Sequence, residues 1–220
     1  MHISPALAEL NAKRFKGFAK AEPRPAIRTF AGDVYRGFDA TSAEPAVLDY
    51  AQDHLRILSG LYGVLRPLDA MRPYRLDHWG RKVAKVLLAD LAAEGSNTIL
   101  NLASREYFAV AGPFLPKKVS LVAPDFRVRT AKGLQFQSFT AKVARGVLAR
   151  FVCDERIADP AEIEAFDRDG WRFDANGSTP RDIACFLAGV EDAAVYGFQA
   201  VADVGQRARD DHRHRVVEEA

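Results

Sequence analysis

The stretch Asp49–Leu76, DYAQDHLRILSGLYGVLRPLDAMRPYRL, carries two glycines three residues apart, Gly60 and Gly63. Before them, apolar residues recur at the spacing of one helix face, which predicts an amphipathic helix. This stripe consists of Leu48, Ala51, Leu55 and Leu58. Because glycine tolerates positive φ and lets another backbone come close, the pair indicates a tight bend. The stretch therefore predicts a helix-hairpin-helix at about residues 46–73.

A helix-hairpin-helix leaves backbone N–H groups unpaired at its bend, where the oxygens of a phosphate accept hydrogen bonds from them. Four arginines surround the bend and favour a phosphate clamp: Arg56, Arg66, Arg72 and Arg75. The alternative is that Gly60 and Gly63 only let two helices pack closely. Pro67 would disturb a second helix that started at Val64, although proline suits the first position of a helix.

The string HLRILSGLYGVLRPLDAMRPYRL at 54–76 resembles the YaaA family of bacterial peroxide-stress proteins. Three further strings agree with it, namely FAGDVYRG at 30–37, NLASREYF at 101–108 and SFTAKVARGVLARF at 138–151. The resemblance covers residues 3–173. It implies a cytosolic DNA-binding protein that protects against hydrogen peroxide, with a connection to iron homeostasis. It also implies an α+β fold, the single mixed α/β "cantaloupe" domain, in which a helix-hairpin-helix lies beside a basic cleft.

The chain departs from the family pattern in three places. Its start matches a later family helix, so we expect the opening strand of the family and its first helices to be missing. After Leu76 the chain passes directly to Trp79-Gly80, which indicates a shortened segment, and beyond Phe173 the resemblance ends. No catalytic activity is firmly attached to the family, so we assign no catalytic residue and no cofactor.

Size and composition are those of an ordinary globular chain. With 220 residues, 48% of them hydrophobic and 27% charged, we expect one domain over residues 1–205 and a charged tail at 206–220. No apolar run is long enough to cross a membrane and no leader precedes the chain, so we expect a cytoplasmic protein. The H-x-H pair in the tail has no further ligands at a metal-binding spacing, so we assign no metal site.

The two cysteines, Cys153 and Cys185, have no C-x-x-C spacing, which suits a reducing cytoplasm. Asp154 and Glu155 follow Cys153, and their negative charge favours the protonated thiol. We therefore interpret Cys153 as a packed small residue rather than a redox sensor.

Charge is strongly segregated along the chain. Residues 54–85 hold seven Lys/Arg against two Asp, which gives +5, and residues 101–153 hold nine Lys/Arg against two acids, which gives +7. Residues 154–193 hold eleven acids against four arginines, which gives −7. Such segregation is what a face that binds a polyanion needs. The alternative is that the blocks neutralise each other across the fold.

The helix expected at about 140–152 has an apolar side and a cationic side. The apolar side consists of Ala144, Val147, Leu148 and Phe151, and the cationic side of Lys142, Arg145 and Arg150. Gly146 lies among these cations, where it would let a phosphate approach the backbone or would serve a helix contact. Asn101 and Ser104 lie where an expected strand at 98–102 gives way to a short helix capped by Ser104, a position that α/β folds use for ligands. We therefore regard Asn101 and Ser104 as a possible ligand pocket.

Periodicity and turn signals predict the remaining elements. We expect an amphipathic helix at 3–18, a strand at 26–30, a helix at 81–93, strands at 119–123 and 127–130, and a hairpin turn at 131–133 leading into a strand at 134–139.

The leading hypothesis is a DNA-binding protein of the peroxide response that contacts the phosphate backbone largely without sequence specificity, with duplex or distorted DNA as its partner and no membrane. Two alternatives remain: a DNA-processing enzyme of the glycosylase or nuclease kind, and a protein-interaction adaptor. The predicted DNA-binding residues are Arg56, Gly60, Leu61, Tyr62, Gly63, Arg66, Arg75, Lys142, Arg145, Gly146 and Arg150.

Overall fold

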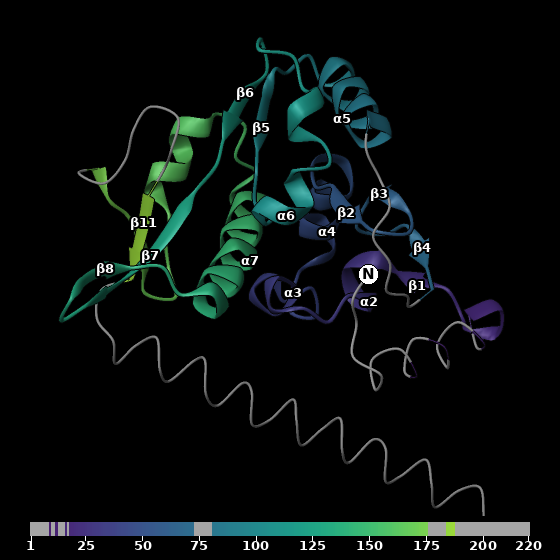
Figure 1. Cartoon of the computed structure of the whole chain (residues 1–220), viewed down its shortest axis with the longest axis horizontal. Coiled ribbons are helices and arrows are strands. Elements are labelled where there is room, and N and C mark those ends of the chain that lie inside the picture. Colours follow the sequence, from purple (N-terminus) through teal and green to yellow (C-terminus); the bar gives the residue numbers. More distant parts are fainter. Residues whose placement is uncertain are drawn as a thin grey trace, which may run out of the picture.

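A computed structural model describes residues 9, 12, 16, 18–72, 81–175 and 184–187, the last four by their backbone alone. Within these residues the chain is a mixed α/β structure built from short helices and small sheets around one long helix, α7 (Figure 1). Most of the helix expected at 3–18, together with Arg75, the side chain of Cys185 and the charged tail, lies outside the described residues.

The first part of the chain is made of short elements: η1 (Phe18–Lys20), β1 (Arg24–Pro25), α2 (Ala26–Thr29), α3 (Asp33–Phe38) and α4 (Pro45–His54). The strand predicted at 26–30 is wrong, because α2 is a single helical turn there. Its ends are held by hydrogen bonds to neighbouring backbone: the Thr29 hydroxyl donates to the Pro25 carbonyl, and the Ile27 N–H donates to the Pro67 carbonyl. Ala26 and Ile27 are buried in this position, so packing outweighs local β propensity.

Gly60 and Gly63 belong to a β-hairpin rather than to a bend between helices. After α4, strands β2 (Ile57–Ser59) and β3 (Gly63–Leu65) pair antiparallel, and β4 (Ala70–Met71) then pairs with β1. The second helix expected after Gly63 is therefore wrong for residues 63–72. Residues 57–59 and 63–65 alternate between buried and half-buried, the two-residue period of a strand, and Gly63 has the positive φ of 79° that its turn needs.

The middle of the chain follows the predicted order. Helix α5 (Arg81–Ala93) ends before Gly95, whose φ is +65°. Strand β5 (Thr98–Leu100) pairs parallel with β6 (Ser120–Val122), and between them lie α6 (Arg105–Phe108), which Ser104 caps as predicted, and η2 (Gly112–Phe114). The hairpin of β7 (Asp125–Thr130) and β8 (Gly133–Gln135) turns at the predicted residues, although β8 ends earlier than expected.

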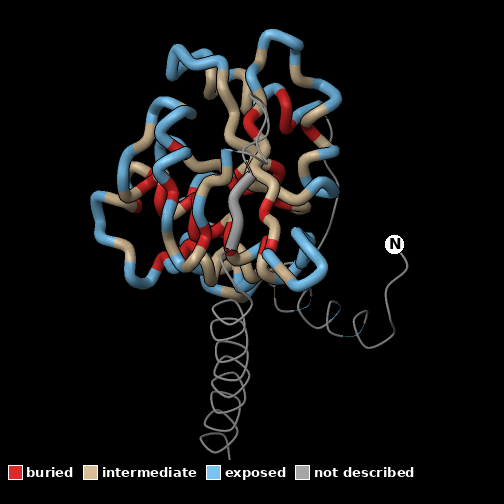
Figure 2. Tube along the Cα trace, turned by 90° about the vertical axis from the view of Figure 1, so that its left-hand side faces the viewer, coloured by how far each residue is buried: buried red, intermediate tan, exposed pale blue. Residues whose placement is uncertain are grey.

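Helix α7 (Ser138–Glu155) runs through the centre of the described structure (Figure 1). After α7 come η3 (Pro160–Ala165), β9 (Asp167–Arg168), β10 (Trp171–Phe173) and β11 (Ala184–Leu187). The last three strands join the hairpin in the sheet β8-β7-β11-β10-β9, on which one side of α7 packs. Its predicted apolar face, Ala144, Val147, Leu148 and Phe151, lies in this core. Ala149 and Cys153 belong to a second buried cluster with residues of α2, α3 and α4, so α7 contributes to both cores. Buried stretches lie in the interior of the described chain, and exposed stretches lie on its outside (Figure 2).

Helices α3 and α7 cross at two glycines. A Cβ added at Gly146 would lie 1.9 Å from the Val34 carbonyl oxygen, and one added at Gly37 would lie 2.1 Å from the Val143 carbonyl oxygen. Real side chains never approach so closely, so both positions require glycine for the two backbones to touch. This contact fixes the spacing of the helices on either side of the candidate site.

Candidate functional site

A cavity of about 600 Å³ opens beside α7, and we refer to it as the α7 cavity. It is bounded by α3, the end of α4 with β2, the apolar side of α5, the segment from β5 to α6, and α7 itself. Its size is that of a typical small-molecule site. Its wall combines aliphatic side chains with an unusual number of rings: Phe30, Tyr35, Phe38, Tyr50, His54, Tyr107 and Phe108.

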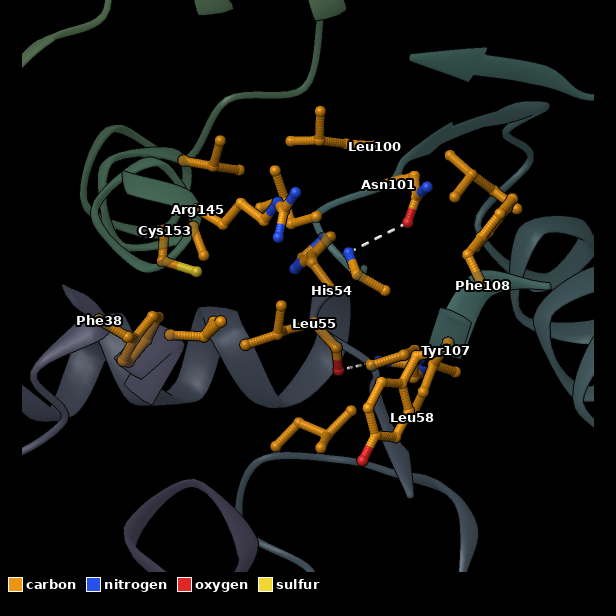
Figure 3. A pocket seen from close by; sticks show the side chains of 18 of the residues that line it. Phe38, His54, Leu55, Leu58, Leu100, Asn101, Tyr107, Phe108, Arg145 and Cys153 are labelled. Carbon is orange, nitrogen blue, oxygen red and sulfur yellow. Dashed lines mark hydrogen bonds between the residues drawn. The ribbon is translucent and has the colours of Figure 1, made fainter. Parts of the chain in front are cut away.

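Two cations of α7 lie at this cavity. Lys142 and Arg145 are three residues apart, so they project from the same face of the helix. Figure 3 shows Arg145 reaching from α7 toward the middle of the cavity, in the direction of His54 and Asn101. Neither cation forms a hydrogen bond or an ion pair with any residue that the structure describes. Partial burial lowers the pKa of Arg145, against the opposing effect of the Asp125 carboxylate.

The loop after β5 supplies polar groups to the opposite side. The Asn101 side-chain oxygen accepts from the Ala103 N–H at 3.0 Å, which holds the amide in place and leaves its NH₂ group as a donor. The Ser104 hydroxyl oxygen accepts from the Tyr107 N–H at 3.3 Å as the cap of α6. Both residues line the α7 cavity, as does Lys142. The structure thus brings the two predicted ligand-pocket residues into one cavity with Lys142 and Arg145, whereas the third predicted cation of α7, Arg150, does not line it.

His54 and Tyr50 form a stacked pair at the end of α4, with ring centroids 4.0 Å apart. His54 Nδ1 donates to the Tyr50 carbonyl oxygen at 2.8 Å, which leaves Nε2 as an acceptor in the neutral ring. The Tyr50 hydroxyl donates to the Ile157 carbonyl oxygen, and burial raises the pKa of Tyr50. Sequence reasoning did not single out His54, although it opens the family-like string at 54–76 and lies four residues, one helical turn, after Tyr50.

Arg56 also lines the cavity, but its guanidinium is already engaged. Its Nε donates to Asp90 Oδ2 at 2.6 Å, and one terminal nitrogen donates to the carbonyl oxygens of Asp53 and Leu55 at the end of α4. A cation in this position completes the C-terminus of a helix. Arg56 therefore has little capacity left for a ligand.

Other predicted DNA-binding residues lie away from the cavity or are covered. The residues of the hairpin turn, Gly60 to Gly63, do not line it, and the Tyr62 hydroxyl accepts from the Arg72 N–H while its ring packs against the core. Arg66 is exposed next to the hairpin. Gly146 is covered by α3, so a phosphate has no access to its backbone.

Arg150 links α7 to the C-terminal end of α3 through hydrogen bonds. Its guanidinium donates to the carbonyl oxygens of Phe38 and Asp39 at 3.2 and 2.9 Å, and to Asp154 Oδ1 at 2.7 Å. It also contacts Ser42. These bonds account for its place in the helix without a ligand.

Cys153 lies in the wall of the cavity and is only 3% exposed. Burial, assisted by the neighbouring Asp154 carboxylate and opposed by Arg150, raises the pKa of the Cys153 thiol to about 12. Since the thiolate is the reactive form, this thiol is inert at neutral pH. The interpretation of Cys153 as a packed residue is confirmed.

The four family-like strings lie far apart in the sequence, and each contributes residues to the α7 cavity, from 30–35, 54–58, 101–108 and 142–149. The family described as "Peroxide stress protein YaaA" matches the chain over residues 1–177. The chain belongs to the YaaA family.

Relatives align with most of the chain. A UPF0246 protein of Rhizorhabdus wittichii is 47% identical over 193 residues, covering 81% of this chain and 76% of its own length. UPF0246 proteins of a Jannaschia species and a Janthinobacterium species are 44% and 42% identical, each covering 82% of this chain and 76% and 77% of their own lengths. The family assignment from the quoted strings is therefore confirmed, and these names add no activity.

None of the helices within the described residues has the length and apolar character required to span a bilayer. Among the same residues, no three His, Cys, Asp or Glu side chains are grouped so that they could hold a metal ion.

Proposed function

We propose that this YaaA-family chain is a DNA-binding protein of the cytoplasmic response to hydrogen peroxide, and that it contacts backbone phosphates largely without sequence specificity. The observation that carries the proposal is the pair Lys142 and Arg145, two cations on one face of α7 without partners among the described residues. Cations left unpaired at a surface opening are available to phosphates, whereas the paired Arg56 and Arg150 are not.

The peroxide part of the proposal is supported by the family, whose description names peroxide stress. The DNA part is supported by the charge segregation, since the segment that contains α7 has an excess of seven positive charges over residues 101–153. Contacts of this kind position a duplex without reading its bases. The β-hairpin at 57–65 moves the expected contact away from Gly60–Gly63 and toward α7.

The test is a titration of labelled duplex, bubble and single-stranded DNA at several salt concentrations, followed by fluorescence anisotropy. Each phosphate that the protein neutralises contributes about −0.9 to the slope of log K against log salt for a duplex. Replacing Lys142 and Arg145 together by glutamine is expected to weaken binding and to reduce the slope by about 2.

The matched control is Lys132→Gln, which removes one positive charge at the tip of the β7–β8 hairpin. It is expected to change the DNA affinity much less than the double variant of α7. A flat salt response, or a double variant that binds like the parent chain, would contradict the proposal.

A further inference from the structure

The α7 cavity has an apolar lining that a DNA phosphate held by Lys142 and Arg145 would leave unused. This part of the wall is formed by Leu55, Leu58, Leu87, Leu100 and Val152. A cavity that combines an unpaired cation at one end with an apolar and aromatic interior has the two features that an amphipathic ligand needs.

The positive and negative side chains that line the cavity come from different elements. Asp33 pairs with Arg36, and Asp90 pairs with Arg56, so both carboxylates are neutralised by neighbours. Glu94 also lines the cavity, and its charge acts on the Tyr50 hydroxyl, whereas the carboxylate that acts on Arg145 is Asp125. The free positive charge is therefore concentrated at α7, away from the acid at the end of α5.

We propose that the α7 cavity binds an amphipathic organic anion of small-molecule size, with its anionic head on Arg145 and Lys142 and its apolar body between α4 and β5 (Figure 3). The planar guanidinium of Arg145 matches a carboxylate, sulfonate or phosphate head. Asn101 lines the same cavity, and its side-chain oxygen is held by the Ala103 N–H. The stacked rings of Tyr50 and His54 and the aliphatic side chains accept the body of the ligand.

This site shares two cations with the proposed DNA contact but does not depend on it. The apolar interior is what distinguishes the two: a backbone phosphate uses only the cations, whereas an organic anion also fills the space behind them. An inorganic anion can interact only with the cations, and an uncharged amphiphile can fill only the apolar space.

The experiment is isothermal titration calorimetry of the full chain with octanoate, octanamide and inorganic phosphate. Octanoate is expected to bind saturably, and octanamide and phosphate are each expected to bind at least about tenfold more weakly, since each lacks one of the two interactions. Arg145→Gln is expected to weaken octanoate binding by about tenfold or more. Lys132→Gln, outside the cavity, is expected to leave it unchanged.

A second variant tests the apolar part. Leu100→Asn places an amide in the wall of the cavity and is expected to weaken octanoate but not phosphate, once circular dichroism shows that it folds. Octanamide or phosphate binding as tightly as octanoate, or an Arg145→Gln variant with undiminished octanoate affinity, would overturn the proposal. DNA titrations of the same samples separate the two ideas, because DNA binding without octanoate binding overturns only this one, and the reverse overturns only the proposed function.

Discussion

Arg145 shows most directly how a single residue of this chain departs from what stability alone would favour. Its guanidinium is partly buried, carries a lowered pKa through that burial, and has no hydrogen-bond partner among the described residues. A base whose pKa is lower in the folded state binds its proton less tightly there than in the unfolded state. At neutral pH the charge therefore opposes folding, and we expect a compensating role in binding.

The first prediction is that Arg145→Gln leaves the free energy of unfolding unchanged or raises it, because the variant removes an unpaired, partly desolvated charge. Urea unfolding followed by circular dichroism measures this. The matched control is Arg150→Gln on the same helix, which breaks bonds to Phe38, Asp39 and Asp154 and is expected to lose about 1–3 kcal/mol. A large loss of stability in Arg145→Gln would instead assign Arg145 a structural role.

The second prediction concerns the Cys153 thiol, whose pKa is raised to about 12 by burial. A free thiol has a pKa of about 8.5, so the unfolded chain loses this proton first as pH rises. Cys153 therefore contributes stability below about pH 8.5 that is progressively lost up to about pH 12. In a Cys185→Ser background, iodoacetamide at pH 8 is expected to alkylate the native thiol at least about 100-fold more slowly than the thiol in urea.

The outcome that would contradict this prediction is rapid alkylation, or rapid oxidation by hydrogen peroxide, of the native thiol. A Cys153→Ala variant is also expected to keep the DNA affinity of the parent chain. If the variant lost that affinity while remaining folded, Cys153 would have a role in binding that its burial does not explain.

At the scale of elements, the crossing of α3 and α7 sets the geometry of the cavity. The third prediction is that Gly146→Ala is destabilising by about 1–3 kcal/mol or more, because the new Cβ would lie 1.9 Å from the Val34 carbonyl oxygen and force the helices apart. Thermal unfolding monitors the change. The matched control is Gly32→Ala, where the new Cβ meets only the Tyr35 ring at 3.8 Å, so we expect little effect.

A Gly146→Ala variant with the stability of the parent chain would show that the two helices can separate at little cost. Loss of DNA binding without any loss of stability would instead favour the original hypothesis, in which Gly146 admits a phosphate. The two interpretations of this glycine are thus separated by measuring stability and affinity on one sample.

Long periodic elements of this fold are predictable from the sequence, whereas short ones are not. The apolar stripe of α7 from Ala144 to Phe151 repeats at helical spacing, so the face that packs on the sheet side was predicted correctly. At Gly60 and Gly63 the same two glycines fit a helical bend or a β-turn, and only the pairing of Ile57 with Leu65 decides between them. That pairing depends on contacts across the chain, which local propensity does not contain.

At the scale of the whole molecule, the candidate site was predictable in part. The position between a strand and a helix pointed to Asn101 and Ser104, and the cationic side of a helix pointed to Lys142 and Arg145. The structure gathers all four around one cavity. Spacing alone did not separate the unpaired Arg145 from Arg150 five residues later. Asp154 lies one turn after Arg150, but the backbone partners of Arg150, Phe38 and Asp39, are more than a hundred residues away in the sequence. His54 was missed although its stacking partner Tyr50 lies one turn earlier on α4, because only the fold shows that the end of α4 borders the cavity.

The last prediction follows from the position of α7 between two buried clusters. Trp171 belongs to the cluster on the sheet side, and Cys153 belongs to the cluster with α2, α3 and α4. Because residues of one helix pack into both, the described structure is expected to unfold in a single cooperative transition. In a Trp79→Phe, Cys185→Ser background, Trp171 fluorescence and Cys153 alkylation are expected to give the same urea midpoint.

Phe166→Leu makes this test sharper, because Phe166 is 1% exposed and lies only in the sheet-side cluster. The variant is expected to lose about 1–2 kcal/mol and to shift both midpoints equally, since destabilising one cluster removes the support that α7 gives to the other. A thiol midpoint that stays in place while the fluorescence midpoint falls would mean that the clusters unfold independently. The α7 cavity would then be an opening between two separate units rather than a site held by one continuous core.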